Sequence, residues 1–170
     1  AVLLPDVLVL DKESRDKNYS FARLVKAWDE TGAGQVMLER VDPEVVESYG
    51  IADIGGVMLE PFKSVALKGL VEKPSPDHAP SNLAVLGRYV LPSNVLEFLK
   101  NTTTGVGGEI QLTDALDELL KLEGLNALET DAEIHDCGNK QGFLGANLAV
   151  GMRDAETKLA IKKLFESNGW

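Results

Sequence analysis

With 170 residues, 44% of them hydrophobic, the chain can form one domain with its own core, and we expect a single domain over residues 1–170. The formal net charge is −10 and the longest Lys/Arg cluster is Lys162-Lys163, which argues against a surface for nucleic acid or anionic membranes. The single cysteine, Cys137, rules out an intramolecular disulfide and a cysteine-based metal cluster, and fits a reducing cytoplasm. No apolar run approaches the ~18 residues of a membrane span.

The first predicted element is the apolar run of residues 1–10. A continuous apolar run is typical of a strand buried on both faces of a parallel sheet, and such a strand usually lies in the interior. No strand precedes it here, so we expect that a segment which normally comes before it is missing. Asp6, next to Pro5, is either a turn residue or a carboxylate that could hold Mg²⁺.

Helices and strands then alternate. Ser20 can cap a helix that ends near Gly32, a strand follows at 35–41, and Asp42 caps a short helix at 44–48. This order predicts a right-handed crossover and an α/β fold with a mixed, mostly parallel sheet and flanking helices. Further strands are expected at 51–60, 63–71, 81–91 and 127–134; helices after Pro92, at 113–122, and as two closing helices at 140–153 and 154–167; and loops at 11–18 and 101–108.

One predicted strand ends in Val71-Glu72-Lys73-Pro74. Pro74 lacks a backbone donor and is expected to hold Lys73 in an extended conformation. Glu72 and Lys73 then place one acceptor and one donor at the carboxyl end of a strand, where open α/β sheets bind ligands. The alternative is a strand end with two solvated charges.

Three further motifs have a structural interpretation, and the one at Gly50 also has a functional one. Gly50 is either a helix C-cap or a point where a ligand approaches the backbone closely. Asn82 lies where the chain turns into the predicted strand at 81–91 and is an ordinary turn residue. A glycine-rich loop leads through Glu109 into a helix that Thr113 or Asp114 is expected to cap.

The densest polar cluster is His135-Asp136-Cys137-Gly138-Asn139-Lys140. One cysteine and two histidines in the whole chain argue against a zinc site. Asp136 is a second candidate carboxylate for a hard cation. The alternative is that Asp136 or Asn139 caps the following helix.

Six segments occur in the order and approximate spacing found in bacterial UTP–glucose-1-phosphate uridylyltransferases: LPDVLV, YGI, VEKP, APSNLAVLGRYVL, GGEIQLTDAL and HDCGNKQG. The chain resembles that family over essentially its whole length. The resemblance implies a Rossmann-like nucleotidyltransferase fold and Mg²⁺-dependent transfer of UMP from UTP to glucose 1-phosphate, which yields UDP-glucose and pyrophosphate. By motif, Asp6 resembles the family's Mg²⁺-binding aspartate, and Asp136 a second aspartate on the metal side.

The resemblance also assigns roles on the sugar side. Glu72 resembles the acid that hydrogen-bonds sugar hydroxyls, and Lys73 the base that holds the sugar phosphate. Gly50 resembles the glycine whose backbone contacts the sugar. Asn82 and Glu109 lie in motifs that line the sugar side.

The family's N-terminal half, with its triphosphate-binding loop and uracil contacts, has no counterpart in these residues. The resemblance therefore implies a truncated domain that keeps the sugar-phosphate half, is inactive alone, and binds UTP only if the missing half is supplied. An unpaired apolar sheet edge would also favour a homo-oligomer, through that edge or the C-terminal helices. The alternatives are a nucleotidyltransferase for another sugar or base, and a non-catalytic sugar-phosphate-binding or oligomerisation module.

Overall fold

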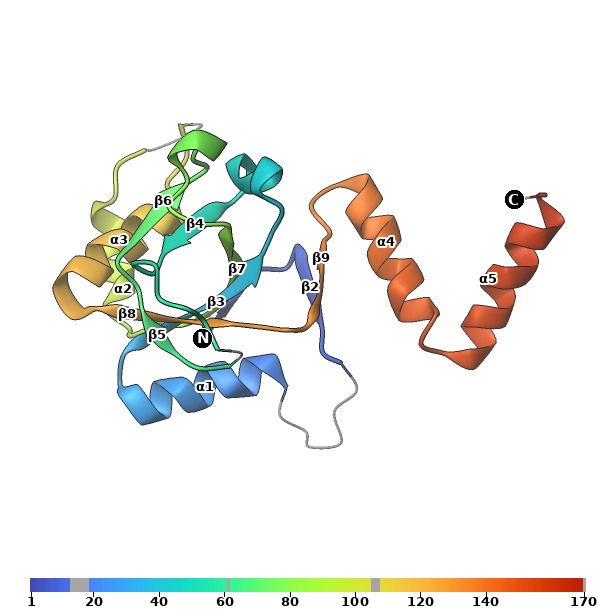
Figure 1. The fold of residues 1–170 in the computed structure, drawn as a ribbon, viewed down its shortest axis with the longest axis horizontal. Helices are drawn as coiled ribbons and strands as arrows, with labels where there is room; N and C mark the ends of the chain where they lie inside the picture. Colours follow the sequence, from blue (N-terminus) through green and yellow to red (C-terminus); the bar gives the residue numbers. More distant parts are fainter. Residues whose placement is uncertain (13–18, 61, 105–107, 170) are drawn as a thin grey trace. The chain divides into compact units, whose positions relative to one another are not determined.

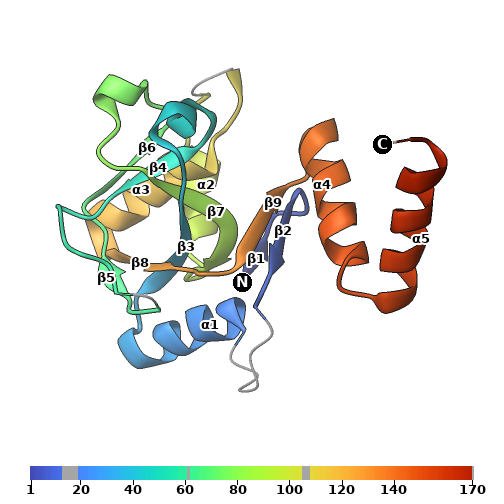
Figure 2. The same cartoon turned by 45° about the vertical axis from the view of Figure 1, so that its right-hand side comes forward.

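The computed structural model describes residues 1–12, 19–60, 62–104 and 108–169, so the predicted loops at 11–18 and 101–108, and Gly107 of the glycine-rich motif, fall partly or wholly outside it. The chain divides into two compact units (Figures 1 and 2). The larger unit comprises residues 1–4 and 11–132, and the smaller unit residues 5–10 and 133–170. That the two units together act as a single domain stays a prediction.

Within the described residues, the larger unit holds a seven-stranded mixed sheet in the order β5-β8-β3-β7-β4-β6, with β1 also paired to β7. Its strands are β1 (Val2–Leu3), β3 (Gly34–Arg40), β4 (Gly50–Asp53), β5 (Val65–Ala66), β6 (Gly69–Glu72), β7 (Leu83–Val90) and β8 (Leu125–Glu129). The α/β prediction is confirmed.

The prediction of a mostly parallel sheet is wrong, because β3–β8 is parallel and the other described pairings are antiparallel. A parallel pair needs a long crossover, usually through an α-helix. The described segments that join β3, β4, β6 and β7 carry no α-helix, only the strand β5 and the short 3-10 helices η1 (Pro43–Ser48) and η2 (Pro76–His78). Each of these strands therefore pairs antiparallel with its neighbours β7 or β4, apart from the β3–β8 pair, while β3 and β4 run in the same direction on either side of β7.

Helices pack on both faces of the buried strand β3. The α1 helix (Ser20–Thr31) contacts β3, and the Gln35 side chain donates to the Thr31 hydroxyl of that helix at 2.8 Å. Side chains alternate between the two faces of a strand, so Val36 and Leu38 lie on the face opposite Gln35. Both belong to the core cluster that contains Leu116 of α3. The remaining helices of this unit are α2 (Val95–Asn101) and α3 (Leu112–Glu123).

Two of the predicted helix starts have different outcomes. Asp42 caps η1 as expected, since its carboxylate accepts from Glu44 N–H at 3.0 Å. Ser20 is not a cap, because α1 has Tyr19 at its N-cap position and Ser20 inside its first turn. Instead, the Asp11 carboxylate accepts hydrogen bonds from the backbone N–H and the hydroxyl of Ser20. The first backbone N–H of α1, which has no partner within the helix, thereby gains one outside it.

The run of residues 1–10 is not one buried strand, and this prediction is wrong. It breaks at Leu4-Pro5-Asp6 into β1 and β2 (Val7–Leu10), because Pro5 has no N–H to donate to a ladder. β1 pairs with β7, and β2 pairs with β9 (Glu133–Asp136) in the smaller unit. Val2 and Leu3 are 36% and 54% exposed, so β1 is not an interior strand.

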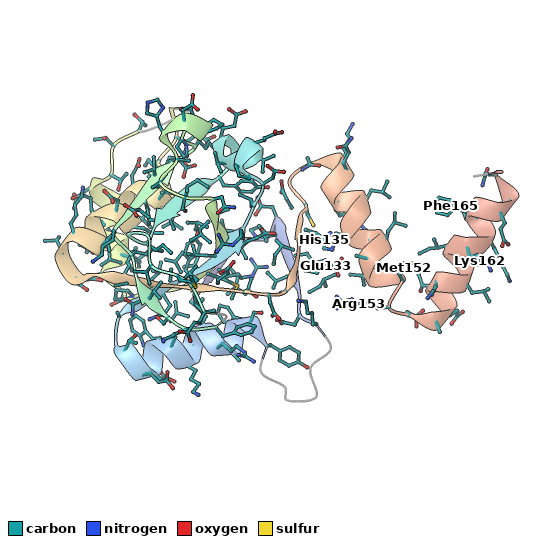
Figure 3. All side chains as sticks on the ribbon, in the orientation of Figure 1. Glu133, His135, Met152, Arg153, Lys162 and Phe165 are labelled. Carbon is teal, nitrogen blue, oxygen red and sulfur yellow. The ribbon has the colours of Figure 1, made fainter. Side chains whose placement is uncertain are left out.

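The smaller unit contains β2, β9 and the helices α4 (Lys140–Gly151) and α5 (Ala155–Ser167), which confirms the two predicted closing helices. Asn139 caps α4 by accepting from Gly142 N–H at 2.8 Å, and Asp154 caps α5 in the same way through Thr157. Glu133 lies 3.0 Å from His135 Nε2 and accepts from Arg153 at 3.2 Å, which joins β9 to the end of α4 (Figure 3). None of the helices that the structure describes is both long and apolar enough to cross a bilayer.

Candidate active site

Glu72 and Lys73 lie at the end of β6, as predicted, but the backbone of Lys73 is not extended. Its φ is +47°, in the left-handed region. The Lys73 N–H donates to Tyr49 O at 2.9 Å, which extends the β4–β6 pairing by one residue before the chain turns into the buried Pro74. This tertiary contact overrides the local preference for an extended residue before proline. A non-glycine residue in this region costs about 1–3 kcal/mol, and such strain often occurs at functional sites.

The carboxylate of Glu72 has a partner on each oxygen. Oε2 accepts from the Thr113 hydroxyl at 2.6 Å, and Oε1 lies 3.7 Å from Lys73 Nζ. The Glu72 side chain is only 12% exposed, whereas that of Lys73 is 45% exposed. A carboxylate has about four lone-pair sites, so Glu72 keeps capacity to accept from ligand hydroxyls in a fixed orientation.

Thr113 is a site residue that the sequence interpretation missed. It was expected, with Asp114, to cap α3, but the N-cap residue is Gln111 and no side chain makes a cap bond there. The Thr113 hydroxyl instead reaches Glu72 across 41 positions of sequence. Thr113 lies in one of the motifs shared with the family, which was the available signal for a site residue. Helix capping was a sufficient explanation for a threonine at that position, so the signal was not used.

Gly50 lies directly beside this pair. It begins β4 opposite Glu72 and follows the cap residue of η1, Tyr49, so the C-cap interpretation is wrong. A Cβ at Gly50 would lie 3.1 Å from Glu72 Oε2 and 3.2 Å from Thr113 Oγ1. The close approach therefore favours glycine here, and the structure brings Gly50, Glu72, Lys73 and Thr113 together as one group, which we call the Glu72 group.

Asn82 and Glu109 lie apart from the described contacts of the Glu72 group. The Asn82 amide donates to Val41 O at 2.8 Å and accepts from Arg40 at 3.0 Å. Arg40 also binds both carboxylate oxygens of Glu129, at 3.2 and 3.3 Å. Asn82 thus ties the start of β7 to the ends of β3 and β8. Glu109 is exposed in the bend before α3, and a ligand role for either residue stays a prediction.

Asp6 and Asp136 come together in the smaller unit. Asp136 ends β9 opposite Val7 of β2, and Cys137 N–H donates to Asp6 O at 2.7 Å. A Cβ at Gly138 would lie 3.0 Å from Asp136 Oδ1 and 3.8 Å from Asp6 Oδ2, so both exposed carboxylates border the same small space. Gly138 N–H donates to Asp136 Oδ1 at 2.8 Å.

This pair fits Mg²⁺ better than an ion that needs a complete protein cage. No group of three or more His, Cys, Asp and Glu residues that could hold a metal occurs among the residues described. Mg²⁺ is usually held by one or two carboxylates and completes its shell with water and substrate phosphates. Asp6 and Asp136 supply that minimal donor set.

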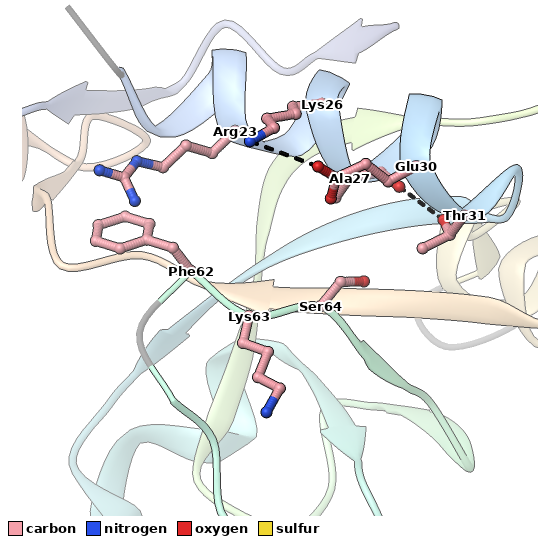
Figure 4. A pocket seen from close by; sticks show the side chains of 8 residues that line it. All are labelled: Arg23, Lys26, Ala27, Glu30, Thr31, Phe62, Lys63 and Ser64. Carbon is pink, nitrogen blue, oxygen red and sulfur yellow. Dashed lines mark hydrogen bonds and ion pairs between the residues drawn. The ribbon is translucent and has the colours of Figure 1, made fainter. Parts of the chain in front are cut away.

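A separate cavity of about 480 Å³ lies between α1 and residues 62–64 (Figure 4). The guanidinium of Arg23 stacks 3.7 Å from the centre of the Phe62 ring. Lys26 pairs with Glu30 at 3.4 Å, and Lys63 with Glu60 at 3.2 Å. None of the predicted site residues lines this cavity.

The model of the nucleotidyl transferase family matches residues 5–152 of this chain. The chain therefore belongs to that family, which agrees with its mixed sheet and flanking helices. It is 44% identical over 167 residues to UTP–glucose-1-phosphate uridylyltransferase of Haemophilus influenzae, covering 98% of this chain and 57% of that protein. The resemblance expected from the motifs is thus confirmed.

Solved structures agree with this. UTP-bound UGPase from Acinetobacter baumannii matches with a TM-score of 0.81 and 37% identity, over 96% of this chain and 54% of that chain. UDP-glucose pyrophosphorylase complexed with UDP-glucose matches with a TM-score of 0.79 and 33% identity, over 89% of this chain and 55% of that one. The Rossmann-like nucleotidyltransferase fold is confirmed. The chain spans about half the length of the relatives it matches.

Proposed function

We propose that this chain serves the transfer of UMP from UTP to glucose 1-phosphate, with UDP-glucose and pyrophosphate as products, and that it supplies sugar-phosphate binding. The observation that carries the proposal is the Glu72 group, in which a nearly buried carboxylate is fixed beside a lysine and a bare glycine backbone. Because the chain covers about half of its relatives, the complete reaction is proposed for the whole protein.

The residue types suit a sugar phosphate. A carboxylate accepts hydrogen bonds from sugar hydroxyls, and glycine lets the ring approach the backbone. The ammonium group of Lys73 is a compact charge suited to a phosphate. An oxygen of the sugar phosphate attacks the α-phosphorus of UTP. The bond between that phosphorus and the oxygen linking it to the β-phosphorus breaks, and this oxygen leaves as a terminal oxygen of pyrophosphate. The attacking phosphate is already ionised, so positioning and charge neutralisation supply the catalysis without a general base.

Mg²⁺ is the proposed cofactor, and Asp6 and Asp136 are the residues that would hold it. The bound ion would neutralise negative charge on the phosphates of UTP. The role of the chain is to keep both carboxylates facing one space, which the β2–β9 pairing and the Cys137–Asp6 backbone bond support.

We also propose that the protein forms a homo-oligomer and that it is located in the cytoplasm. The smaller unit supports self-association, because Ala146 is the only buried residue of α4 and α5 that the structure describes. Large apolar side chains such as Phe143, Leu144 and Leu159 are more than half exposed. An apolar groove of about 430 Å³ on the same part of the chain is lined by Leu148, Met152, Ile161 and Phe165, among others. Figure 3 labels Met152 and Phe165. A monodisperse monomer in light scattering at high concentration would contradict the oligomer.

Calorimetry on the 170-residue chain with glucose 1-phosphate, UDP-glucose and UTP tests the function. We expect the wild type to bind glucose 1-phosphate and Lys73→Ala to bind it about 10-fold more weakly, a loss of about 1.4 kcal/mol. Lys100→Ala is the matched control, because Lys100 is also an exposed lysine paired with a nearby glutamate, Glu97. No heat with glucose 1-phosphate or UDP-glucose would overturn the proposal. Tighter binding of another sugar 1-phosphate would reassign the substrate.

A further inference from the structure

We propose that Asn139 is a positioning residue that fixes the carboxylate of Asp136 and the first turn of α4 with a single side chain. Cation binding at Asp6 and Asp136 is then coupled to the stability of α4. The inference rests on the proposed metal role of these two aspartates, and it assigns Asn139 a function beyond capping a helix.

The two ends of the Asn139 amide have different partners. Nδ2 donates to Asp136 Oδ2 at 3.2 Å, and Oδ1 accepts from Gly142 N–H at 2.8 Å. The second of these bonds is an ordinary N-cap, for which aspartate and serine serve as well as asparagine. The first bond requires a donor, and neither oxygen of an aspartate at this position would supply one.

The carboxylate of Asp136 is therefore held at both oxygens by neutral donors. Gly138 N–H binds Oδ1 at 2.8 Å, and Asn139 Nδ2 binds Oδ2. None of the described ion pairs involves Asp136, so these bonds orient the carboxylate without adding a cationic side chain beside it. Each oxygen retains a lone-pair site that a cation can use.

The start of α4 is packed against the backbone carbonyl of Asp136. A Cβ at Gly142 would lie 1.7 Å from Asp136 O, so only glycine fits between the first turn of the helix and this carbonyl. The Asn139 side chain spans the same junction. The orientation of Asp136 and the position of the first turn of α4 are consequently linked through one short segment.

Cation binding and the folding of this segment are thermodynamically linked. A cation that binds the folded site stabilises the structure around it, and by reciprocity the loss of that structure weakens the cation's affinity. Partners that orient a metal ligand without touching the metal typically change its affinity 10–100-fold when they are removed. Asn139 should therefore affect cation affinity although it is not itself a ligand.

The test uses Asn139→Ser in the 170-residue chain, because serine keeps a neutral cap acceptor and loses the long amide donor. Mn²⁺ is titrated while the paramagnetic broadening of the Gly138 amide is followed by NMR. We expect an apparent Kd about 10-fold higher than in the wild type. Asn147→Ser is the control, because Asn147 lies on α4 and its side chain binds only a carbonyl of its own helix, Phe143 O, among the described partners.

A second measurement keeps the inference testable if Asn139→Ser does not fold. In the wild type, Mg²⁺ should slow hydrogen exchange of the Gly142 and Phe143 amides, which bind Asn139. It should leave the Lys158 amide of α5 unchanged. Equal Mn²⁺ Kd values for the wild type and Asn139→Ser, or a hydrogen-exchange rate at Gly142 that does not change with Mg²⁺, would overturn the role of Asn139. Failure of the metal site itself is distinguishable, because Asp6→Asn would then bind Mn²⁺ as the wild type does.

Discussion

The hydroxyl of Thr113 donates a 2.6 Å hydrogen bond to the carboxylate of Glu72, across 41 positions of the sequence. The bond joins the first turn of α3 to the end of β6, and these two elements also pack together. It fixes one oxygen of a side chain that is only 12% exposed. The acid at the strand end is therefore an oriented acceptor and not a solvated charge, and a ligand role for the VEKP motif stays a prediction.

Thr113→Val should weaken binding of glucose 1-phosphate about 10-fold and lower stability, because valine keeps the shape of threonine and removes the donor. A hydrogen bond to a charged group contributes about 1.5–3 kcal/mol. Thr113→Ser keeps the hydroxyl and should retain most of the affinity. Calorimetry and thermal unfolding measure both effects. Equal affinity in the valine variant and the wild type would show that this bond does not orient Glu72 for a ligand.

Gly50→Ala should abolish sugar-phosphate binding while the chain still folds. The added methyl group would lie 3.1 Å from Glu72 Oε2 and 3.2 Å from Thr113 Oγ1, so it must displace the hydrogen-bonded pair. Overpacking of this kind costs about 1–3 kcal/mol. Gly69→Ala in β6 is the matched control, because its Cβ would meet only Asp53 Cβ at 3.8 Å. Unchanged binding in Gly50→Ala would argue against a ligand at this backbone.

Gly142→Ala and Gly145→Ala should have opposite effects on the stability of the smaller unit, although both glycines lie in α4. Alanine normally stabilises a helix interior by up to about 1 kcal/mol relative to glycine, and Gly145 faces open space. At Gly142 the new Cβ would lie 1.7 Å from Asp136 O and must push the first turn away. Urea unfolding followed by circular dichroism measures the difference. Two stabilising substitutions would show that α4 is not tightly packed on Asp136.

The stability of α5 should fall at acid pH because of Asp154. The hydrogen bond from Thr157 N–H to its carboxylate lowers the pKa of Asp154 below the ordinary value of 3.8. A carboxyl group whose folded pKa is lowered stabilises the fold above its unfolded pKa, and the contribution disappears as pH falls through the folded pKa. Asp154→Asn keeps a cap acceptor that does not titrate.

NMR shifts of α5, followed from neutral pH down through the carboxyl range, compare the two proteins. The helix content of α5 in the wild type should fall as the pH is lowered from neutral. In Asp154→Asn it should change less over the same range. Identical profiles would mean that the cap contributes nothing to the acid response of α5.

Features that depend on neighbouring residues were predictable from the sequence. The Asp42 cap and its following proline, and the two closing helices, follow from side-chain chemistry and spacing within a few positions. The α/β class follows from the alternation of such elements. The ordered motifs also identified the family, because several short segments in fixed order are far more specific than any one of them.

Features that depend on contacts between distant residues needed the tertiary structure. Strand direction is set by pairing partners, so β3 and β7 are antiparallel although the local pattern suggested a parallel sheet. Lys73 has a left-handed backbone because Tyr49 O holds its N–H, against the local preference before Pro74. The sequence by itself determined which segments form helices, and it supplied most of the candidate site residues. Only the tertiary structure decided that Thr113 orients Glu72 and that Asp6 faces Asp136, because those contacts join residues far apart in the chain.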